Sequence, residues 1–254
     1  MKLLENRSII ITGASTGIGR AAALLFARHG ARLVLNARNG ERLDAVCAEV
    51  AAMGGEAQSV MGDIADAATH KACVAAAMDA YGALDGAFNN AAMVGPMAPL
   101  AEVAPADFVE FVRTNLCSAH LAVHAQVPAM LKSGGGALVF TSSFVGNSCG
   151  LPAMGAYATS KVGLSGIVKS LAADYAHMGI RANALLPGGT NTAMAGDAVQ
   201  KEWAAGLHPL RCIAQPEEIA QAALFLLSDM ASFVTGSNLW ADGGASVTKV
   251  QAPW

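Results

Sequence analysis

The chain has 254 residues, of which 54% are hydrophobic and only 14% are charged. That is enough apolar material for one large α/β domain and too little polar material for long disordered tails. A net charge of -3 provides no basic surface for nucleic acid. Neither a signal peptide nor an apolar run of membrane-spanning length is visible, so a cytoplasmic protein without a membrane partner is expected.

The five cysteines are dispersed along the chain and show neither CxxC nor zinc-ligand spacing. They are Cys47, Cys73, Cys117, Cys149 and Cys212. An odd, scattered set is typical of reduced thiols in the cytoplasm. We therefore expect neither a disulfide framework nor a metal site.

The chain opens with a strand, a glycine-rich turn, a helix and a second strand. The strand is expected at Ser8–Thr12, the turn at Gly13–Gly19, the helix at Arg20–His29 and the next strand at Ala31–Asn36. Glycines at the first, fifth and seventh positions of the turn would let the backbone approach a pyrophosphate at the helix N-terminus. Their spacing, G-x-x-x-G-x-G, differs from the general G-x-G-x-x-G fingerprint. Glycines also shape turns for packing alone, but the strand–turn–helix context favours phosphate binding.

The same alternation continues to the end of the chain. Helices are expected at Arg42–Met53, Thr69–Tyr81, Pro105–Lys132 with a late bend at Pro128, a stretch through Tyr157 to about Met178, and Pro216–Leu227. Strands are expected at Ala57–Met61, Leu84–Asn89, Ala137–Ser142, Ile180–Leu186 and Asn238–Ala241. Seven strands with intervening helices predict a single α/β domain over residues 1–254, with a doubly wound parallel sheet and helices on both faces.

Unusual polar and glycine clusters all follow predicted strands. They are the glycine turn, Arg38, Asp63, Asn89, Ser143 and Pro187-Gly188. Ligands of such sheets bind at the carboxyl ends of the strands. Scattered structural residues would not all choose the same edge, so this location indicates a binding site.

A tyrosine and a lysine lie four residues apart within Tyr157–Lys161. On a helix this spacing places both on one face, one turn apart. The pKa of a free tyrosine is about 10, and a neighbouring cation lowers it by favouring the phenolate. The pair would then act as a general acid and base, although the spacing alone is common on solvated helices.

Taken in order, these motifs resemble the short-chain dehydrogenase/reductase family along nearly the whole chain. The matching segments are Thr12–Gly19, Asn89-Asn90-Ala91, Asn115, Ser143, Tyr157–Lys161, Pro187-Gly188 with Thr192, and Asp242-Gly243-Gly244. The resemblance, closest to members of the 3-oxoacyl-ACP reductase or carbonyl reductase type, implies an extended Rossmann fold and a nicotinamide cofactor. It also implies a homotetramer or homodimer built on the two long helices. One departure is Ala92, where glycine is usual.

The resemblance implies four catalytic residues. Tyr157 would exchange the proton with the substrate oxygen, and Lys161 would lower the Tyr157 pKa and hold the nicotinamide ribose. Ser143 would hydrogen-bond the substrate oxygen, and Asn115 would hold a water linking Lys161 to solvent. Alternatively, the Ser143 hydroxyl caps its own turn, as we expect for Ser142, and the Asn115 amide bonds a neighbouring strand.

The same resemblance implies the cofactor-binding positions. They are Gly13, Ser15, Thr16, Gly17, Ile18, Gly19, Arg38, Asp63, Ile64, Asn89, Ala91, Tyr157, Lys161, Pro187, Gly188, Thr190 and Thr192. Where NAD enzymes place a carboxylate for the adenosine ribose, this chain has Ala37 followed by Arg38. A guanidinium there favours NADP(H) over NAD(H), although Thr16 occupies a position where many NADP enzymes have a second basic residue. Asp63 would bond the adenine and Asn89 the adenosine ribose.

A mostly apolar region is expected around the substrate. Residues at about 190–210 would form a mobile lid. The lining side chains would be Met194, Trp203, Leu207 and His208 from the lid, Met93, Val94 and Pro96 after the fourth strand, and Phe144, Val145 and Leu151 after the fifth. No arginine cluster is present to bind an anion, so a neutral ketone, alcohol or acyl thioester is expected. His208 is expected to be a lid or interface residue rather than a catalyst.

The sequence therefore predicts an oxidoreductase that transfers a hydride between NADP(H) and a carbonyl or secondary alcohol. A nucleotide-sensing protein that lost the reaction is the alternative from another class, but such proteins lose the tyrosine or lysine that this chain keeps. An isomerase or dehydratase on the same scaffold is a third interpretation.

Overall fold

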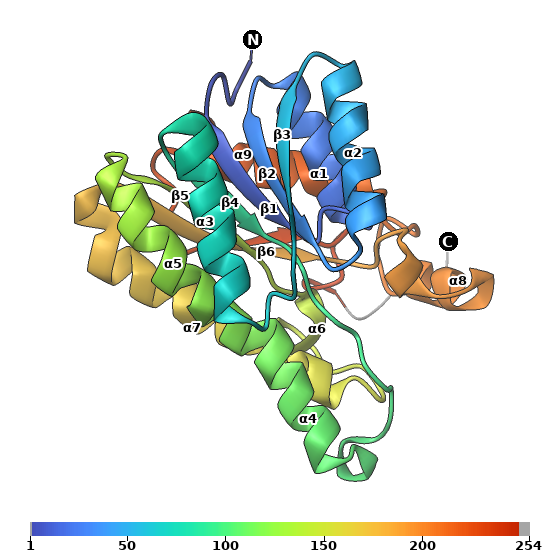
Figure 1. Ribbon diagram of the computed structural model, residues 1–254. Coiled ribbons are helices and arrows are strands. Elements are labelled where there is room, and N and C mark those ends of the chain that lie inside the picture. The colour runs from blue at the N-terminus through green and yellow to red at the C-terminus, as the bar shows by residue number, and fades with distance from the viewer. Residues whose placement is uncertain (1, 249–254) are drawn as a thin grey trace.

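The computed structural model describes residues 2–248 and contains one seven-stranded parallel sheet (Figure 1). The strands are β1 (Ser8–Thr12), β2 (Arg32–Ala37), β3 (Glu56–Met61), β4 (Gly86–Asn89), β5 (Gly136–Thr141), β6 (Ile180–Pro187) and β7 (Asn238–Ala241). Their order is β3-β2-β1-β4-β5-β6-β7, so the direction of winding reverses between β1 and β4. The predicted doubly wound α/β fold is confirmed.

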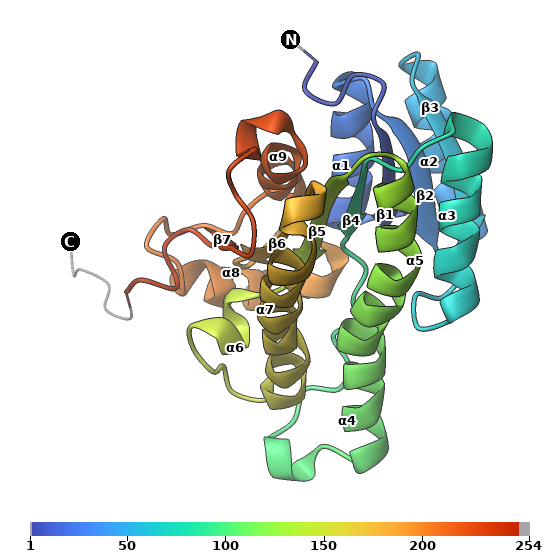
Figure 2. The same ribbon diagram turned by 90° about the vertical axis from the view of Figure 1, so that its left-hand side faces the viewer.

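Helices cover both faces of the sheet (Figure 2). One layer contains α1 (Gly17–Arg28), α2 (Gly40–Ala52) and α9 (Pro216–Leu227), and the other contains α3 (Ala67–Tyr81), α5 (Ser118–Lys132) and α7 (Gly155–Tyr175). Successive side chains of a strand point to opposite faces. Accordingly, Ile9 and Ile11 pack under the first layer and Ile10 under the second, which explains why β1 is hydrophobic at consecutive positions.

The continuous helix predicted at Pro105–Lys132 is wrong in one respect. It is divided into α4 (Pro105–Val112), a π-helical turn at Arg113–Cys117, and α5. Within the turn, the buried Asn115 side chain bonds Met93 and Ser160 on neighbouring segments. Single π turns in helices are often found at functional sites, and this one places an amide against the loop that follows β4.

Two short helices lie where the sequence predicted none, α6 (Phe144–Asn147) after β5 and α8 (Ala198–Gly206) within the predicted lid. The α8 helix begins with a reciprocal capping box between Asp197 and Gln200, a signal that the sequence already contained. No residue of α8 is buried. Within residues 2–248, the helices are all too short or too polar to cross a membrane.

Candidate active site

The carboxyl ends of the strands form one edge of the sheet, and the predicted site residues follow them there. The glycine turn follows β1, and Arg38 and Asp63 lie one and two residues beyond β2 and β3. Asn89 ends β4, Ser143 lies two residues beyond β5, and Pro187 ends β6. Register pairs such as Thr12↔Asn36 and Asn89↔Phe140 keep these ends level.

The glycine turn lets a ligand approach the protein backbone closely at the start of α1. Gly13 and Gly17 have φ of +68° and +53°, which side chains rarely adopt. A Cβ on Gly19 would lie 2.1 Å from the carbonyl oxygen of Gly13. The side chain of the N-cap residue, Thr16, makes no capping bond, so the N–H groups of the first turn stay available for an anion. The turn therefore fits the pyrophosphate of a dinucleotide.

Two segments distant in the sequence meet at this turn. A Cβ on Gly17 would lie 3.0 Å from the Thr192 methyl group, which places the segment after β6 over the start of α1. The Thr190 hydroxyl donates to the Gly188 carbonyl at 3.1 Å. Thr190 and Thr192, predicted as cofactor residues, therefore border the same space as the glycine turn.

Tyr157 and Lys161 lie on α7, one turn apart as predicted. The Lys161 ammonium nitrogen is 5.9 Å from the centre of the Tyr157 ring. Lys161 is 2% exposed and donates to the Thr141 carbonyl at 2.7 Å. One acceptor uses one of the three hydrogens that an ammonium group offers, so the others remain for further acceptors.

Burial dominates the ionisation of both groups. It lowers the pKa of Lys161 to about 7, because the charged form is poorly solvated. Burial also raises the pKa of Tyr157, an effect that hydrogen bonding to Ser143 partly opposes. The expected fall in the Tyr157 pKa beside Lys161 is therefore not seen, since desolvation of the phenol outweighs its hydrogen bond with Ser143.

Ser143 makes both of the contacts considered for it, whereas Ser142 makes a contact that was not predicted. The Ser143 hydroxyl accepts from the backbone N–H of Val145 at 3.1 Å, so it caps its own turn while also bonding Tyr157. Ser142 instead donates to the Lys161 carbonyl at 2.9 Å. The prediction that Ser142 caps its own turn is wrong, because its side chain points toward α7.

Asn147 is a site residue that sequence reasoning missed. Its amide donates to the Ser142 hydroxyl at 3.1 Å and to the Ser143 carbonyl at 3.0 Å. Its oxygen accepts from Ser165 on α7 at 2.8 Å, and Ser165 in turn accepts from Asn238 on β7 at 3.0 Å. This network fixes the backbone that carries Ser143. A lone asparagine four residues beyond a serine gave no sequence signal for it.

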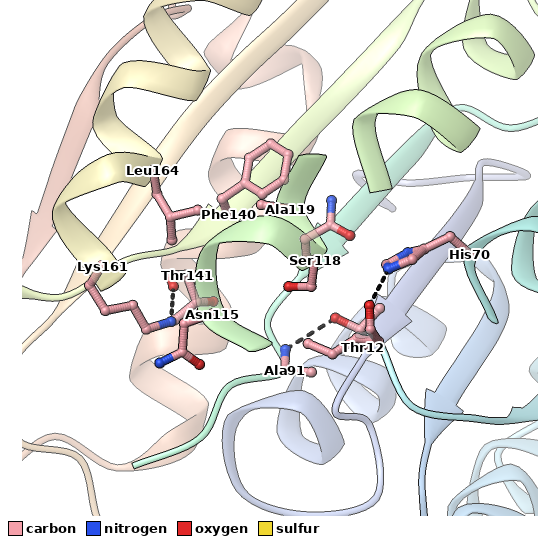
Figure 3. Close-up of a pocket in the computed structure, with 12 residues that line it drawn as sticks. Thr12, His70, Ala91, Asn115, Ser118, Ala119, Phe140, Thr141, Lys161 and Leu164 are labelled. Carbon is pink, nitrogen blue, oxygen red and sulfur yellow. Dashed lines mark hydrogen bonds between the residues drawn. The ribbon is translucent and has the colours of Figure 1, made fainter. Parts of the chain in front are cut away.

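A small polar cavity lies behind Lys161 (Figure 3). Lys161, Asn115 and Thr141 lie on one side of it, with Ala91 and Thr12 opposite. About 10 Å³ of the cavity is open to the centre of a water molecule, which is roughly the space that one water requires. The cavity therefore connects Lys161 with Asn115 through a volume of water size.

The amide of Asn115 has no hydrogen left for such a water. Its nitrogen donates to the Met93 carbonyl and the Ser160 hydroxyl, both at 3.0 Å, and its oxygen accepts from the Met93 N–H at 2.8 Å. An amide has two hydrogens, and both are used. The amide thus joins the loop after β4 to α7. This resembles the alternative given for Asn115, in which its amide bonds a neighbouring segment rather than a water.

Asn89 is paired with Gln126 rather than directed at a ligand. Each amide donates to the other, at 2.9 and 3.0 Å. The Thr12 hydroxyl accepts from the N–H groups of Asn90 and Ala91 at 3.0 and 3.1 Å. These bonds join the ends of β1 and β4 across the switch point. The pairing with Gln126 uses one of the two amide hydrogens of Asn89, so one hydrogen of this side chain stays available for a ligand.

Arg38 and Asp63 follow the neighbouring strands β2 and β3 at the same edge of the sheet. Arg38 is exposed, and no side-chain partner of its guanidinium was found within residues 2–248. One Asp63 oxygen accepts from the Ala65 N–H at 2.9 Å. The adjoining Ile64 carbonyl bonds the buried His70 at 2.7 Å, a histidine whose pKa burial lowers and which the sequence analysis did not single out.

A third apolar cluster, separate from the two core layers, surrounds Tyr157. Phe144, Val145 and Ala245 are its buried members. The partly buried side chains packed against them are Cys149, Leu151, Met154, Tyr157, Ala158 and Leu207. Phe144, Val145, Leu151 and Leu207 were predicted to line the substrate region. The phenol therefore lies among neutral apolar groups drawn from three loops.

Comparisons with known proteins agree with this geometry. A family model described as enoyl-(acyl carrier protein) reductase matches residues 13–246. The 2,5-dichloro-2,5-cyclohexadiene-1,4-diol dehydrogenase of Sphingobium indicum is 41% identical, covering 96% of this chain and 98% of its own. The cyclohexanol dehydrogenase of an Acinetobacter species is 39% identical, covering 94% of each chain. The crystal structure of levodione reductase superimposes with a TM-score of 0.91 at 32% identity, covering 96% of this chain and 99% of its own.

Proposed function

The chain belongs to the short-chain dehydrogenase/reductase family of NAD(P)-dependent oxidoreductases, and from that premise we propose that it oxidises an alicyclic secondary alcohol to its ketone. The observation that carries this proposal is the apolar cluster around Tyr157. It offers a neutral substrate apolar surface on several sides and no charged group for an anion. Two relatives are named for alcohols with a six-membered carbon ring, and such a ring fits these surroundings.

We assign the proton transfer to Tyr157. In the direction of oxidation, its phenolate accepts the hydroxyl proton of the substrate, and Ser143 hydrogen-bonds the same oxygen as its charge changes. A nicotinamide cofactor bound against the glycine turn would supply the acceptor for the hydride that leaves the carbinol carbon. Apolar groups around Tyr157 limit the access of water to the reacting oxygen.

We assign Lys161 to the cofactor ribose and to the supply of positive charge beside the phenol. Among residues 2–248, its ammonium has one acceptor, the Thr141 carbonyl, so the remaining hydrogens suit ribose hydroxyls and one water in the adjoining cavity. Asn115 is proposed to hold that water through its backbone, because both hydrogens of its amide are occupied.

We propose NADP(H) as the preferred cofactor. Arg38 directly follows β2, is exposed and lies beyond Ala37 rather than a carboxylate. A guanidinium suits a 2′-phosphate. Replacing it in Arg38→Leu should raise the KM for NADP⁺ by about tenfold, the loss of one charge-assisted bond, and leave the KM for NAD⁺ within about twofold. A wild-type enzyme that prefers NAD⁺ would contradict this assignment.

We further propose a cytoplasmic homotetramer or homodimer. Large apolar side chains are exposed on the long helices, with Val109 on α4 at 63% and Val162 on α7 at 42%. A second group, Met230 and Phe233 beyond α9, is exposed at 62% and 102%. Coverage of these side chains by partner subunits would remove them from water, and two separate groups would suit a tetramer.

An absorbance screen of the reduced nicotinamide tests the proposed function. Cyclohexanol, cyclohexane-1,4-diol and cyclohexanone would be offered with both cofactors, beside 2-octanol and an acetoacetyl thioester. We expect the cyclic substrates to have the highest kcat/KM. Preference for the thioester would favour the second candidate, an acyl-thioester reductase, which the description of the family model supports. Substrate conversion without any absorbance change would indicate an isomerase or dehydratase instead.

A further inference from the structure

His208 lies at the junction between the lid and the strand ends. It is 2% exposed and follows α8 by two residues. The sequence suggested only a lid or interface role for it. Its ring contacts the segment after β6, the segment after β7 and Phe144, which directly follows Ser143.

Both ring nitrogens of His208 are committed. Nε2 is 2.9 Å from the Gly189 N–H, which is a donor, so Nε2 must accept. Nδ1 is 2.7 Å from the Ala204 carbonyl, which is an acceptor, so Nδ1 must donate. The neutral Nδ1–H tautomer alone satisfies both bonds. With no nitrogen left for a substrate, His208 is not a proton-transfer catalyst.

Glycines surround the ring and make the space for it. A Cβ on Gly188 would lie 2.4 Å from Nε2, one on Gly189 3.1 Å from Cε1, and one on Gly243 3.3 Å from the His208 Cβ. The fourth contact is the Phe144 ring, 5.8 Å away between centroids and tilted by 56°. The backbone of two segments, one after β6 and one after β7, therefore leaves space for this imidazole.

The rest of the lid is weakly held. No residue of α8 is buried, and Met194, Val199 and Trp203 are 50%, 75% and 53% exposed. At its other end, the lid is attached by backbone bonds through Ala214, which donates to Gly189 and accepts from Asn191, each at 2.8 Å. His208 thus supplies the buried side-chain attachment at the C-terminal end of α8.

We propose that His208 is a positioning residue that docks the lid onto Gly189 and thereby aligns the backbone of the cofactor-binding segment with the wall of the substrate site. Its kinetic consequence rests on the proposed dehydrogenase function. A docked lid contacts substrate equally in the ground state and the transition state, so losing the dock raises KM more than it lowers kcat.

The test compares His208→Gln, which keeps an acceptor for Gly189, with His208→Phe, which keeps a ring beside Phe144 but no acceptor. In the phenylalanine variant, we expect the KM for alcohol and cofactor to rise about tenfold, which corresponds to the loss of one buried hydrogen bond. We expect kcat to change by less than about threefold. The glutamine variant should recover at least half of that change on a logarithmic scale. His177→Gln, on an exposed helix end, is the matched control and should equal the wild type.

Two measurements stand apart from catalysis. In the nitrogen-15 NMR spectrum of the wild type, the His208 signal is identified as the one that His208→Gln removes. This signal should show the Nδ1–H tautomer, and the Nε2–H tautomer would overturn the proposal. Hydrogen exchange of residues 187–191 should accelerate in His208→Phe and not in His208→Gln. A folded His208→Phe variant whose KM equals that of the wild type would also overturn the proposal, whether or not its kcat falls. An inactive wild type with the expected tautomer and exchange would contradict the proposed function alone.

Discussion

At the scale of single residues, the site combines two ionisable groups that burial moves away from their charged forms. Lys161 has a pKa of about 7, and Tyr157 has a raised pKa. The spacing of the pair followed from helix geometry, so both positions were predictable. The direction of each pKa was not, because neither the burial of the pair nor the bond from Lys161 to Thr141 is visible in a helical pattern.

Lys161→Met should make the cofactor-free protein more stable near pH 6. The folded pKa lies near 7 and the unfolded one near 10.4, so the unfolded wild type binds the extra proton between these values. The wild type therefore gains stability as the pH rises through this window, by up to about 1.4 kcal/mol per pH unit. Methionine has no such dependence.

Thermal unfolding of both proteins from pH 6 to pH 10 measures this difference. The advantage of Lys161→Met should shrink steadily above pH 7. An advantage that stays constant with pH would show that Lys161 is not desolvated as described. Activity should be lost in the variant at every pH, since the charge beside Tyr157 is gone.

At the scale of elements, the strand-to-helix connections carry the site, and they divide what the sequence could predict from what it could not. The strands, the glycine turn and the long helices follow from periodicity. The π turn at Arg113–Cys117 does not, because it depends on Asn115 bonding a loop 22 residues earlier in the sequence. The bond of Ser142 to the Lys161 carbonyl, in place of the expected cap of its own turn, likewise depends on tertiary contacts, as do the bonds of Asn147.

Asn147→Leu should lower kcat by about tenfold while leaving cofactor affinity within about twofold, since a small misplacement of a catalytic group costs at least this much. The leucine removes both donors that hold Ser142 and the Ser143 backbone. Steady-state kinetics and cofactor titration separate the two effects. Ser148→Ala is the control, because the Ser148 hydroxyl bonds only the Phe144 carbonyl within its own turn. A folded Asn147→Leu enzyme with wild-type kcat would refute the positioning role.

At the scale of the whole molecule, the parallel sheet brings residues from six strand ends to one edge, and the apolar surface lies on the long helices and beyond α9. The sequence predicted the doubly wound parallel sheet, and the clusters that follow its strands indicated the edge where they meet. The sequence could not predict which apolar side chains are exposed, because it does not distinguish a hydrophobic helix residue that faces the sheet from one that faces a partner subunit.

Val109→Glu should shift the protein toward a smaller assembly. Val109 is 63% exposed on α4, and a carboxylate buried in an interface without a partner costs several kcal/mol. Analytical ultracentrifugation of the variant and the wild type at matched concentrations measures the change. Identical sedimentation would exclude this face of α4 from the interface.

The central claim is that this molecule is a dehydrogenase whose proton carrier is Tyr157, and one variant tests it most directly. Tyr157→Phe keeps the ring within its apolar cluster and removes only the hydroxyl, so cofactor affinity should stay within about threefold while kcat falls by at least about 10³-fold, within the range known for general acid–base groups. The measurement is turnover of cyclohexanol or its best substitute, beside cofactor titration of the same preparation. Residual activity above about a tenth of the wild-type value, with cofactor binding intact, would contradict the account.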